Sequence, residues 1–314
     1  MTVIDTIIKF GIVIMFVAIF VYFISMGVFT WWQRWTKVAP PPMSDSIEKF
    51  QGTTNRYVCM YAYYEKNDEY KENLSYFLKY AITDSIDYYI IINGTCSVKI
   101  PTDAPNITVI YRPNKGYDFG AWEYCIKNYI VPSNQTYDYY IFLNSSVRGP
   151  IPPSLAGDGW LNRFLELFQN NNVKLAGTTI NVLMESWEDY PLDYEPPYTH
   201  VQSMFFILNY EGFQFLLKEG FFDDEEVLNN TTDMKYIVAN KEIMMSQLIL
   251  KNNWNINAML PNYRDRDYRY IKSNFNPSSE NPCRTGDDPD KKNYFGRDIY
   301  PEEVIFFKTN LSNI

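Results

Sequence analysis

Four short apolar runs limit the fold of this chain more than any other feature of its sequence. They are RYVCMYAYY (56–64), DYYIII (87–92), ITVIY (107–111) and YDYYIFL (137–143). Each run is too short for a good helix and is rich in β-branched or aromatic residues, which favours strands. The runs are apolar on both faces, as strands are in a parallel sheet that is covered on both sides.

Segments with helical periodicity lie between and after these runs. Residues 72–82, 118–129 and 160–168 place apolar side chains at the spacing of one helix face. The alternation of strand and helix predicts an α/β protein with an open, mostly parallel sheet and helices on both faces. Such sheets bind ligands beyond the carboxyl ends of their strands. All four runs end in polar clusters, which we therefore expect to meet at one edge.

An apolar stretch precedes this region. Residues 10–32 carry no charge and are long enough to span a bilayer, which takes about 20 residues. A cleaved signal peptide would have a shorter apolar core followed by small residues, whereas WWQRW follows here. The sequence thus favours an uncleaved signal anchor in residues 1–37, a proline-bearing stalk in 38–54 and a domain in 55–314. The expected protein crosses the lipid bilayer once.

The orientation of this anchor stays open. A long domain after the helix suits a type II protein with a lumenal or external domain, but Arg34 and Lys37 outnumber Lys9 and favour the opposite sense. Glycosylation sequons, which would fit a lumenal glycoprotein, are numerous in a chain that is rich in Asn throughout. They begin at Asn73, Asn93, Asn106, Asn134, Asn144, Asn229, Asn230 and Asn310.

Composition excludes some kinds of partner. The formal charge of -9 disfavours nucleic acid as a ligand, although a nucleotide needs only a few local cations. The 27 tyrosines either serve carbohydrate and base stacking or reflect a biased genome composition. Cys59, Cys96, Cys125 and Cys283 form no CxxC, and His200 is the one histidine, so no zinc site follows from spacing. The sequence allows a disulfide but assigns no pairing.

The loop RPNKGYDFGAW (112–122) concentrates polar side chains after the third run. Taken singly, Asp118 would be an N-cap and Gly116 a residue with positive φ. Taken together, the residues suggest a nucleotide site, in which Asp118 accepts hydrogen bonds from a ribose or a uracil imide. Arg112 or Lys115 would meet a phosphate and Tyr117 would stack. The donor-binding candidates at this edge are Asn93, Arg112, Asn114, Gly116, Tyr117 and Asp118.

Three motifs in order, RPNKGYDFGAW, YIFLNSSVRGP and HVQSMFFILN, resemble the glycosyltransferase-like family that includes rhamnan-synthesis protein F. The tail YFGRDIYPEEVIFFKTN resembles the ending of uncharacterised algal, fungal, bacterial and viral relatives, so the match spans about residues 56–310. The resemblance implies a GT-A-like nucleotide-diphospho-sugar transferase fold. It also implies hexosyl or deoxyhexosyl transfer from a nucleotide-sugar to a glycan or glycoconjugate acceptor in polysaccharide biosynthesis.

The chain departs from the resembled fold at one position. GT-A enzymes usually hold Mn or Mg with an Asp-x-Asp, whereas this chain reads Asn144-Ser145-Ser146. Hard cations prefer carboxylate oxygens, so the metal is weakly held, takes ligands from elsewhere or is absent. Asn144, Ser146 and His200 are the candidate ligands, and Arg148 or Arg112 could replace the charge. The triplet could equally be an Asn-led turn; the resemblance adds a donor-site role for Asn144, Ser145 and Ser146.

Candidates for the acceptor side and for catalysis lie further along. His200 begins an apolar strand that also carries Gln202, and it is either a structural residue or a ligand of phosphate, metal or acceptor. Glu242 borders the apolar face of a helix over 235–251, as a general base or as an ordinary salt-bridged carboxylate. The acceptor-side set is His200, Gln202, Ser203 and Glu185; the rival bases are Glu185, Glu188 and Asp189 of a predicted lid.

Two functions compete. The first is a membrane-anchored glycosyltransferase, favoured by the loop that carries Arg112 and Asp118. The second is a catalytically inactive GT-A-like module that binds a glycan or nucleotide, favoured by the missing Asp-x-Asp. A dinucleotide-dependent oxidoreductase is excluded because no GxGxxG follows a strand.

Overall fold

A seven-stranded sheet forms the centre of the domain, in the order β10-β6-β9-β4-β1-β2-β3. Strand β9 runs antiparallel to both β4 and β6, and every other pairing is parallel. The predicted α/β class with a mostly parallel sheet is therefore confirmed. The strands are β1 (Tyr57–Tyr63), β2 (Ile86–Asn93), β3 (Ile107–Arg112), β4 (Tyr139–Asn144), β6 (Val173–Gly177), β9 (Phe205–Asn209) and β10 (Asn255–Ala258).

The computed structural model describes residues 56–184, 194–231, 233–276 and 294–309. The predicted anchor (1–37) and stalk (38–54) lie outside this part of the chain, as do Glu185, Glu188 and Asp189 of the predicted lid. Within the described ranges, no helix combines the length and the apolar character that a bilayer span requires.

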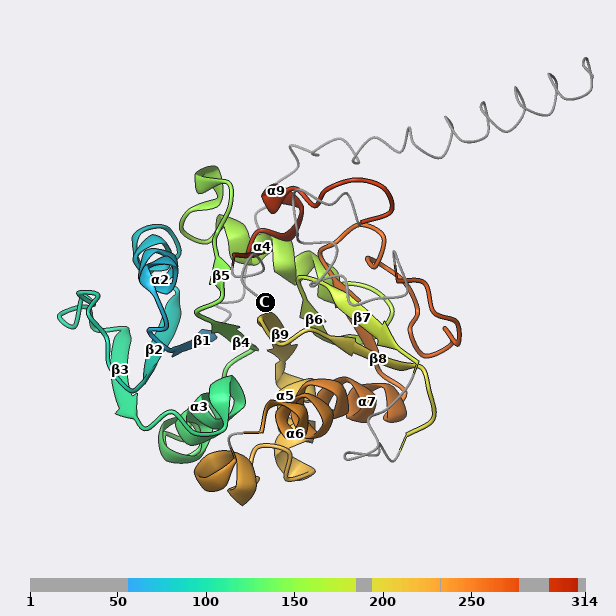
Figure 1. Ribbon diagram of the computed structural model, residues 1–314, viewed down its shortest axis with the longest axis horizontal. Helices are drawn as coiled ribbons and strands as arrows, with labels where there is room; N and C mark the ends of the chain where they lie inside the picture. Colours follow the sequence, from blue (N-terminus) through green and yellow to red (C-terminus); the bar gives the residue numbers. More distant parts are fainter. Residues whose placement is uncertain (1–55, 185–193, 232, 277–293, 310–314) are drawn as a thin grey trace, which may run out of the picture. The chain divides into compact units, whose positions relative to one another are not determined.

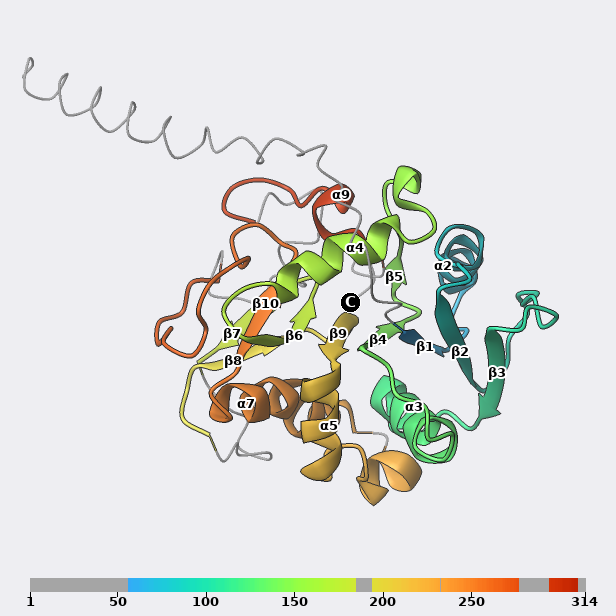
Figure 2. The same cartoon turned by 180° about the vertical axis from the view of Figure 1, so that it is seen from behind.

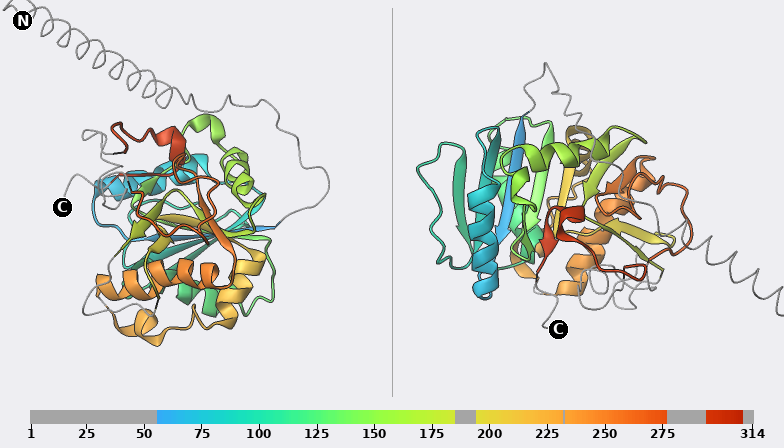
Figure 3. Two further views of the ribbon diagram at one scale, coloured as in Figure 1. Left: turned by 90° about the vertical axis from the view of Figure 1, so that its right-hand side faces the viewer. Right: turned by 90° about the horizontal axis from the view of Figure 1, so that it is seen from above.

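Helices cover both faces of the sheet (Figures 1 and 2). Helices α2, α4 and α9 lie on one side, and α3, α5, α6 and α7 lie on the other, which the edge-on view in Figure 3 also shows. The helices are α2 (Asp68–Tyr80), α3 (Tyr117–Cys125) with η1 (Ile126–Ile130), η2 (Pro153–Leu155), α4 (Gly159–Leu165) with η3 (Glu166–Phe168), α5 (Tyr210–Lys218), η4 (Glu226–Asn230), α6 (Met234–Ile237), η5 (Val238–Ile243), α7 (Met244–Lys251) and α9 (Pro301–Val304).

Each face of the sheet has its own apolar core. Phe77, Trp160 and Phe306 belong to the core beneath α2 and α4, and Trp122 and Phe206 belong to the core beneath α3 and α7. The Trp122 indole is fully buried and donates to the Met60 carbonyl at 3.1 Å, so its polar atom is satisfied inside the core. Apolar burial of this kind is the main stabilising contribution to folding.

Two small antiparallel sheets lie outside the central one. Strand β5 (Val147–Arg148) pairs with β11 (Phe307–Lys308), which brings residues 307–308 to the segment after β4. Strand β7 (Ile180–Leu183) pairs with β8 (Tyr198–Val201).

The prediction that His200 starts one continuous strand was wrong. Strand β8 ends at Val201, β9 begins at Phe205, and the two belong to different sheets. The chain turns at residues 202–204 because β9 must enter the central sheet antiparallel, between β4 and β6. Gln202 therefore lies outside β8 and does not share a strand face with His200.

Burial also corrects the interpretation of several sequons. Asn73 and Asn93 are almost fully buried and Asn144 is 9% exposed, so these three side chains cannot carry a glycan in the folded domain. The abundance of sequons in this sequence is therefore a poor guide to a lumenal location. Cys59, Cys96 and Cys125 are free thiols, and Cys283 lies outside the described residues.

Candidate active site at the carboxyl edge of the sheet

Polar side chains gather where β2, β3 and β4 end. The register of the parallel pairs sets Asn93 beside Arg112, and Asn144 beside Ala62 of β1. The clusters that follow the four apolar runs thus meet at one edge, as the sequence predicted and as ligand sites of open α/β sheets require.

Arg112 holds the loop that follows β3. Its buried guanidinium donates to Asn93 Oδ1 at 2.8 Å and to the carbonyls of Lys115 at 2.9 Å and Leu228 at 3.4 Å. Burial lowers the pKa of this group. Lys115 donates to the Asn229 carbonyl at 2.7 Å. Both side chains thus fix the loop against residues 228–229, and their predicted contact with a phosphate stays a prediction.

Gly116 is the N-cap of helix α3, at a point where a side chain has no room. Its φ is +65°, and a Cβ added there would stand 1.9 Å from the Val227 carbonyl oxygen. Its N–H donates to the Thr231 carbonyl at 3.0 Å. The glycine is thus required by both backbone conformation and close packing.

The neighbouring candidates of this loop differ in their contacts. Tyr117 also has positive φ, and its carbonyl accepts a hydrogen bond from Asn93 Nδ2 at 3.5 Å. Asn114 is exposed.

The interpretation of Asp118 as an N-cap was wrong. Gly116 occupies the N-cap position, and Asp118 lies in the first turn of α3. Its carboxylate accepts a hydrogen bond from Asn144 Nδ2 at 2.7 Å. Burial raises the pKa of Asp118 to about 6, which Asn144 and Lys308 partly oppose and the nearby Glu242 carboxylate reinforces. Near neutral pH this group is an anionic acceptor with little compensating charge.

The triplet Asn144-Ser145-Ser146 is a turn whose side chains are bonded to each other and to β1. Asn144 Oδ1 accepts from the Ser146 N–H at 2.9 Å and from its hydroxyl at 2.6 Å, which turns Nδ2 toward Asp118. The Ser145 N–H donates to the Ala62 carbonyl at 3.1 Å, and the hydroxyl of Ser145 bonds the backbone of Tyr64. Asn144 thus orients Asp118, and Ser145 anchors the turn.

A second cluster joins Glu242, His200 and Ser203. Glu242 Oε1 lies 3.5 Å from His200 Nε2, and Oε2 accepts from both the N–H and the hydroxyl of Ser203. His200 Nδ1 lies 2.7 Å from the Tyr198 carbonyl, which fixes the ring. Burial would raise the pKa of Glu242, but the hydrogen bonds and charge of His200 and the Ser203 donors outweigh it, so the pKa is lowered.

The side chains of Glu242 and its neighbour Lys241 point in different directions from the same helical segment. Both belong to η5, a π-helical segment between α6 and α7, and such segments often occur at functional sites. Lys241 turns into the core, where its ammonium lies 2.6 Å from Glu123, whereas Glu242 turns toward β8.

A backbone hydrogen bond links the two clusters. The Asn144 N–H donates at 3.2 Å to the carbonyl of Met204, the residue that follows Ser203. The Glu242 carboxylate is also close enough to Asp118 to raise its pKa.

The candidate metal ligands do not fit a divalent cation. Both ring nitrogens of His200 have partners, Asn144 Oδ1 accepts two hydrogen bonds, and the Ser146 hydroxyl donates to it. In the described ranges no three His, Cys, Asp or Glu side chains group as a metal site. Glu185 lies outside those ranges.

Two other features lie beside this site. Gln202 is buried, and its N–H donates to the Thr179 carbonyl at 3.2 Å.

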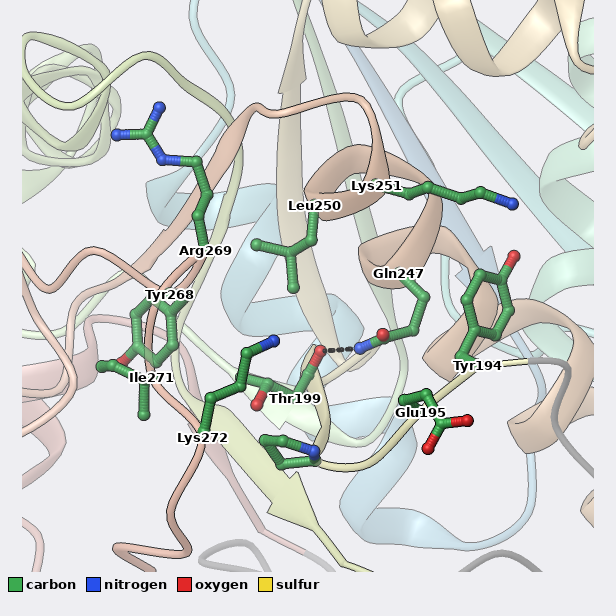
Figure 4. Close-up of a pocket in the computed structure, with 11 residues that line it drawn as sticks. Tyr194, Glu195, Thr199, Gln247, Leu250, Lys251, Tyr268, Arg269, Ile271 and Lys272 are labelled. Carbon is green, nitrogen blue, oxygen red and sulfur yellow. Dashed lines mark hydrogen bonds between the residues drawn. The ribbon is translucent and has the colours of Figure 1, made fainter.

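A hollow of about 180 Å³ lies against β8 and α7 (Figure 4). Alternation along β8 turns Thr199 into this hollow and His200 toward Glu242. The hollow is lined in part by Tyr194, Glu195, Lys251, Arg269 and Lys272, and it does not include Asp118 or Glu242.

Sequence reasoning missed Lys308. It lies in β11, opposite Val147, and its ammonium lowers the pKa of Asp118. The only local signal was its position after the short apolar run VIFF in the tail.

Comparisons with solved structures give weak similarities. A mannosyltransferase from Pyrobaculum calidifontis, solved with GDP-Man and Mn2+, is 10% identical over 77% of this chain, with a TM-score of 0.40. The bifunctional glycosyltransferase WbbM (12% identity, 55% of this chain) and GlyE from Streptococcus pneumoniae TIGR4 (12%, 64%) both give 0.33. This chain spans 64%, 34% and 45% of the three structures' lengths.

A search of curated proteins found no match. The family model for rhamnan synthesis protein F matches residues 98–281, which contain the loop at Asp118, the turn at Asn144 and the Glu242 cluster. Because this match covers more than half of the 314 residues, the chain belongs to the rhamnan synthesis protein F family, whose motifs it was predicted to resemble.

Proposed function

We propose that this protein is a glycosyltransferase with a GT-A-like fold that moves a sugar from a nucleotide-sugar to a glycan or glycoconjugate acceptor. The family supports sugar transfer. The observation that carries the proposal is an Asp118–Asn144 pair at the carboxyl edge, linked through the backbone of Met204 to the cluster that holds a partly buried, ionised Glu242.

Asp118 would hold the nucleoside. Its carboxylate keeps acceptor capacity beyond the one hydrogen bond from Asn144, because an ionised carboxylate offers about four lone-pair positions. Ribose hydroxyls and the imide N–H of a pyrimidine are matching donors. The surrounding loop is fixed by Arg112 and Gly116, so little ordering would be needed on binding.

Glu242 would act as the general base. The acceptor hydroxyl gives its proton to Glu242 as its oxygen bonds to the anomeric carbon, and the nucleoside diphosphate leaves with the electron pair of the broken glycosidic bond. His200 and Ser203 hold the carboxylate in place and keep it ionised. A positioned base of this kind contributes about 10²–10⁴-fold to a rate.

The test is turnover of a panel of nucleotide-sugars by the full chain, with nucleoside diphosphate release as the readout. We expect Glu242→Gln to lower kcat by about 10²-fold or more while leaving nucleotide affinity near wild type. Glu219→Gln, an exposed position at the end of α5, is the matched control. Equal kcat values for the Glu242→Gln variant and wild type would refute the assignment.

An inactive binding module is the second candidate, favoured by a turn at 144–146 that lacks carboxylates. It predicts tight nucleotide binding without release of product from any donor in the panel.

Membrane anchoring is a separate proposal that rests on residues 10–32 alone. We propose a single-pass protein of type II, with the domain lumenal or external. Deletion of residues 1–37 should move the protein from alkali-washed membranes to the soluble fraction. Retention in the membrane would show that the association lies elsewhere.

A further inference from the structure

Residues 307–309 are fixed onto the turn that orients Asp118. In the β5–β11 pair, Lys308 lies opposite Val147, the residue after Ser146. The Thr309 N–H donates to the Ser146 carbonyl at 2.9 Å, and its hydroxyl accepts from Asn73 Nδ2 at 2.8 Å. The position of Lys308 is therefore set by backbone pairing and not by its own long side chain.

The strand pairing also sets the face from which the Lys308 side chain leaves. Thr309 follows β11, continues the pairing through its N–H bond to Ser146, and turns its hydroxyl to Asn73 of α2. Because side chains alternate along extended backbone, Lys308 leaves on the face opposite to Thr309. Its ammonium stands near enough to the Asp118 carboxylate to oppose the effect of burial on that group. A partly buried cation thus lies at the edge where the nucleotide is proposed to bind.

Other cations near this edge have different partners. Arg112 and Lys115 donate to backbone carbonyls of the neighbouring loop. Arg148, the predicted replacement for the metal charge, donates to Asn73 Oδ1 and Glu72 Oε2, each at 2.9 Å, on the side of α2. Lys308 differs from them in that the β5–β11 pairing holds its backbone beside the turn that orients Asp118.

We infer that Lys308 binds the diphosphate of the donor and stabilises the negative charge that develops on the leaving nucleoside diphosphate. This inference rests on the proposed function. As the bond between the anomeric carbon and the diphosphate oxygen breaks, the electron pair stays on that oxygen, and the ammonium donates a hydrogen bond to the phosphate. A lysine does this as a compact point charge with three donors.

The experiment measures nucleotide affinity of the full chain by calorimetry in EDTA. The probes are UDP, GDP and dTDP, each compared with its nucleoside. Lys308→Met keeps the length of the side chain and removes its charge. We expect it to weaken binding of the preferred diphosphate by about 10-fold or more, as loss of a charge-assisted contact does, and to leave nucleoside binding unchanged. Lys308→Arg should retain most of the affinity.

Controls separate this effect from a general loss of charge or of folding. Lys272→Met removes one exposed cation beside the hollow of Figure 4 and should change neither affinity. Thermal unfolding checks each variant. If Lys308→Met does not fold, the ratio of diphosphate affinities between Lys308→Arg and Lys308→Gln decides, and a ratio of one overturns the inference.

The remaining outcomes distinguish the inference from the function on which it rests. Wild-type protein that binds none of the three diphosphates overturns both. Diphosphate binding that Lys308→Met leaves unchanged, or nucleoside binding that falls equally, overturns the Lys308 assignment alone. Binding that vanishes in EDTA and returns with manganese also overturns it, because a metal ion would then hold the diphosphate.

Discussion

Helix α3 carries two acidic side chains, and the protein treats them in opposite ways. Glu123 is fully buried, lies 2.6 Å from the Lys241 ammonium and accepts from the Asp224 N–H at 3.1 Å. Asp118, in the first turn, is only partly buried, and its direct hydrogen bond comes from the neutral amide of Asn144. Burial raises the pKa of both carboxyls.

The two environments indicate different roles: Glu123 holds parts of the domain together, whereas Asp118 lies where a ligand is proposed to bind. The Glu123 carboxyl faces the Lys241 ammonium, which also lies 3.4 Å from Asp224, so this buried contact ties α3 to η5 on one face of the sheet. Asp118 is a partly buried acceptor at the carboxyl edge whose direct hydrogen-bond partner is neutral, an arrangement that proteins keep where a ligand completes the site. The same π-helical segment serves both regions, because Lys241 faces Glu123 and Glu242 faces His200.

The largest expected effect comes from breaking the buried pair of Glu123 and Lys241. Lys241→Met should lower the free energy of unfolding by about 3–5 kcal/mol, because it leaves the Glu123 carboxylate buried without a counter-charge. Urea unfolding measures the loss. Lys235→Met, an exposed position on α6, is the matched control and should change the free energy of unfolding by less than about 0.5 kcal/mol.

The double variant Glu123→Gln, Lys241→Met sharpens this test. It removes both charges, so it should be more stable than Lys241→Met alone. If Lys241→Met were as stable as wild type, the buried pair would contribute no architecture, and the contrast with Asp118 would fail.

The positions of the strands and the binding edge could be predicted because their signals are local. Runs such as 107–111 and 137–143 carry strand character in their own residues, and the order of elements implies parallel pairing. The predicted edge residues Asn93, Arg112 and Asn144 consequently lie together.

The sequence does not reveal contacts that join distant parts of the chain. Nothing near Arg112 in sequence points to its bond with the Leu228 carbonyl, which lies 116 residues away. The break between β8 and β9 follows from the antiparallel insertion of β9, and Lys308 reaches the site through pairing with β5. No periodicity within either segment encodes such pairings.

Charge removal at Asp118 tests the functional half of the comparison, with a smaller effect of opposite sign. Asp118→Asn keeps the shape and leaves an oxygen for the Asn144 donor, but it removes the poorly compensated charge. We expect weaker nucleotide binding by calorimetry together with a stability gain of about 1–3 kcal/mol near pH 7.5. Asp103→Asn, at an exposed position, should do neither.

The pH dependence identifies the cause of that gain. With a pKa of about 6 in the folded protein against 3.8 as the ordinary value, folded Asp118 holds its proton more strongly than the unfolded chain does. Wild-type stability therefore falls, through this group, as pH rises between these values. Asp118→Asn has no such proton, so the stability difference between the two proteins should be near zero around pH 4 and reach its maximum above about pH 6. Parallel urea unfolding across that range measures it. A difference independent of pH would mean that packing, and not the buried charge, separates the two proteins, and Asp118 would then resemble Glu123 in being part of the architecture.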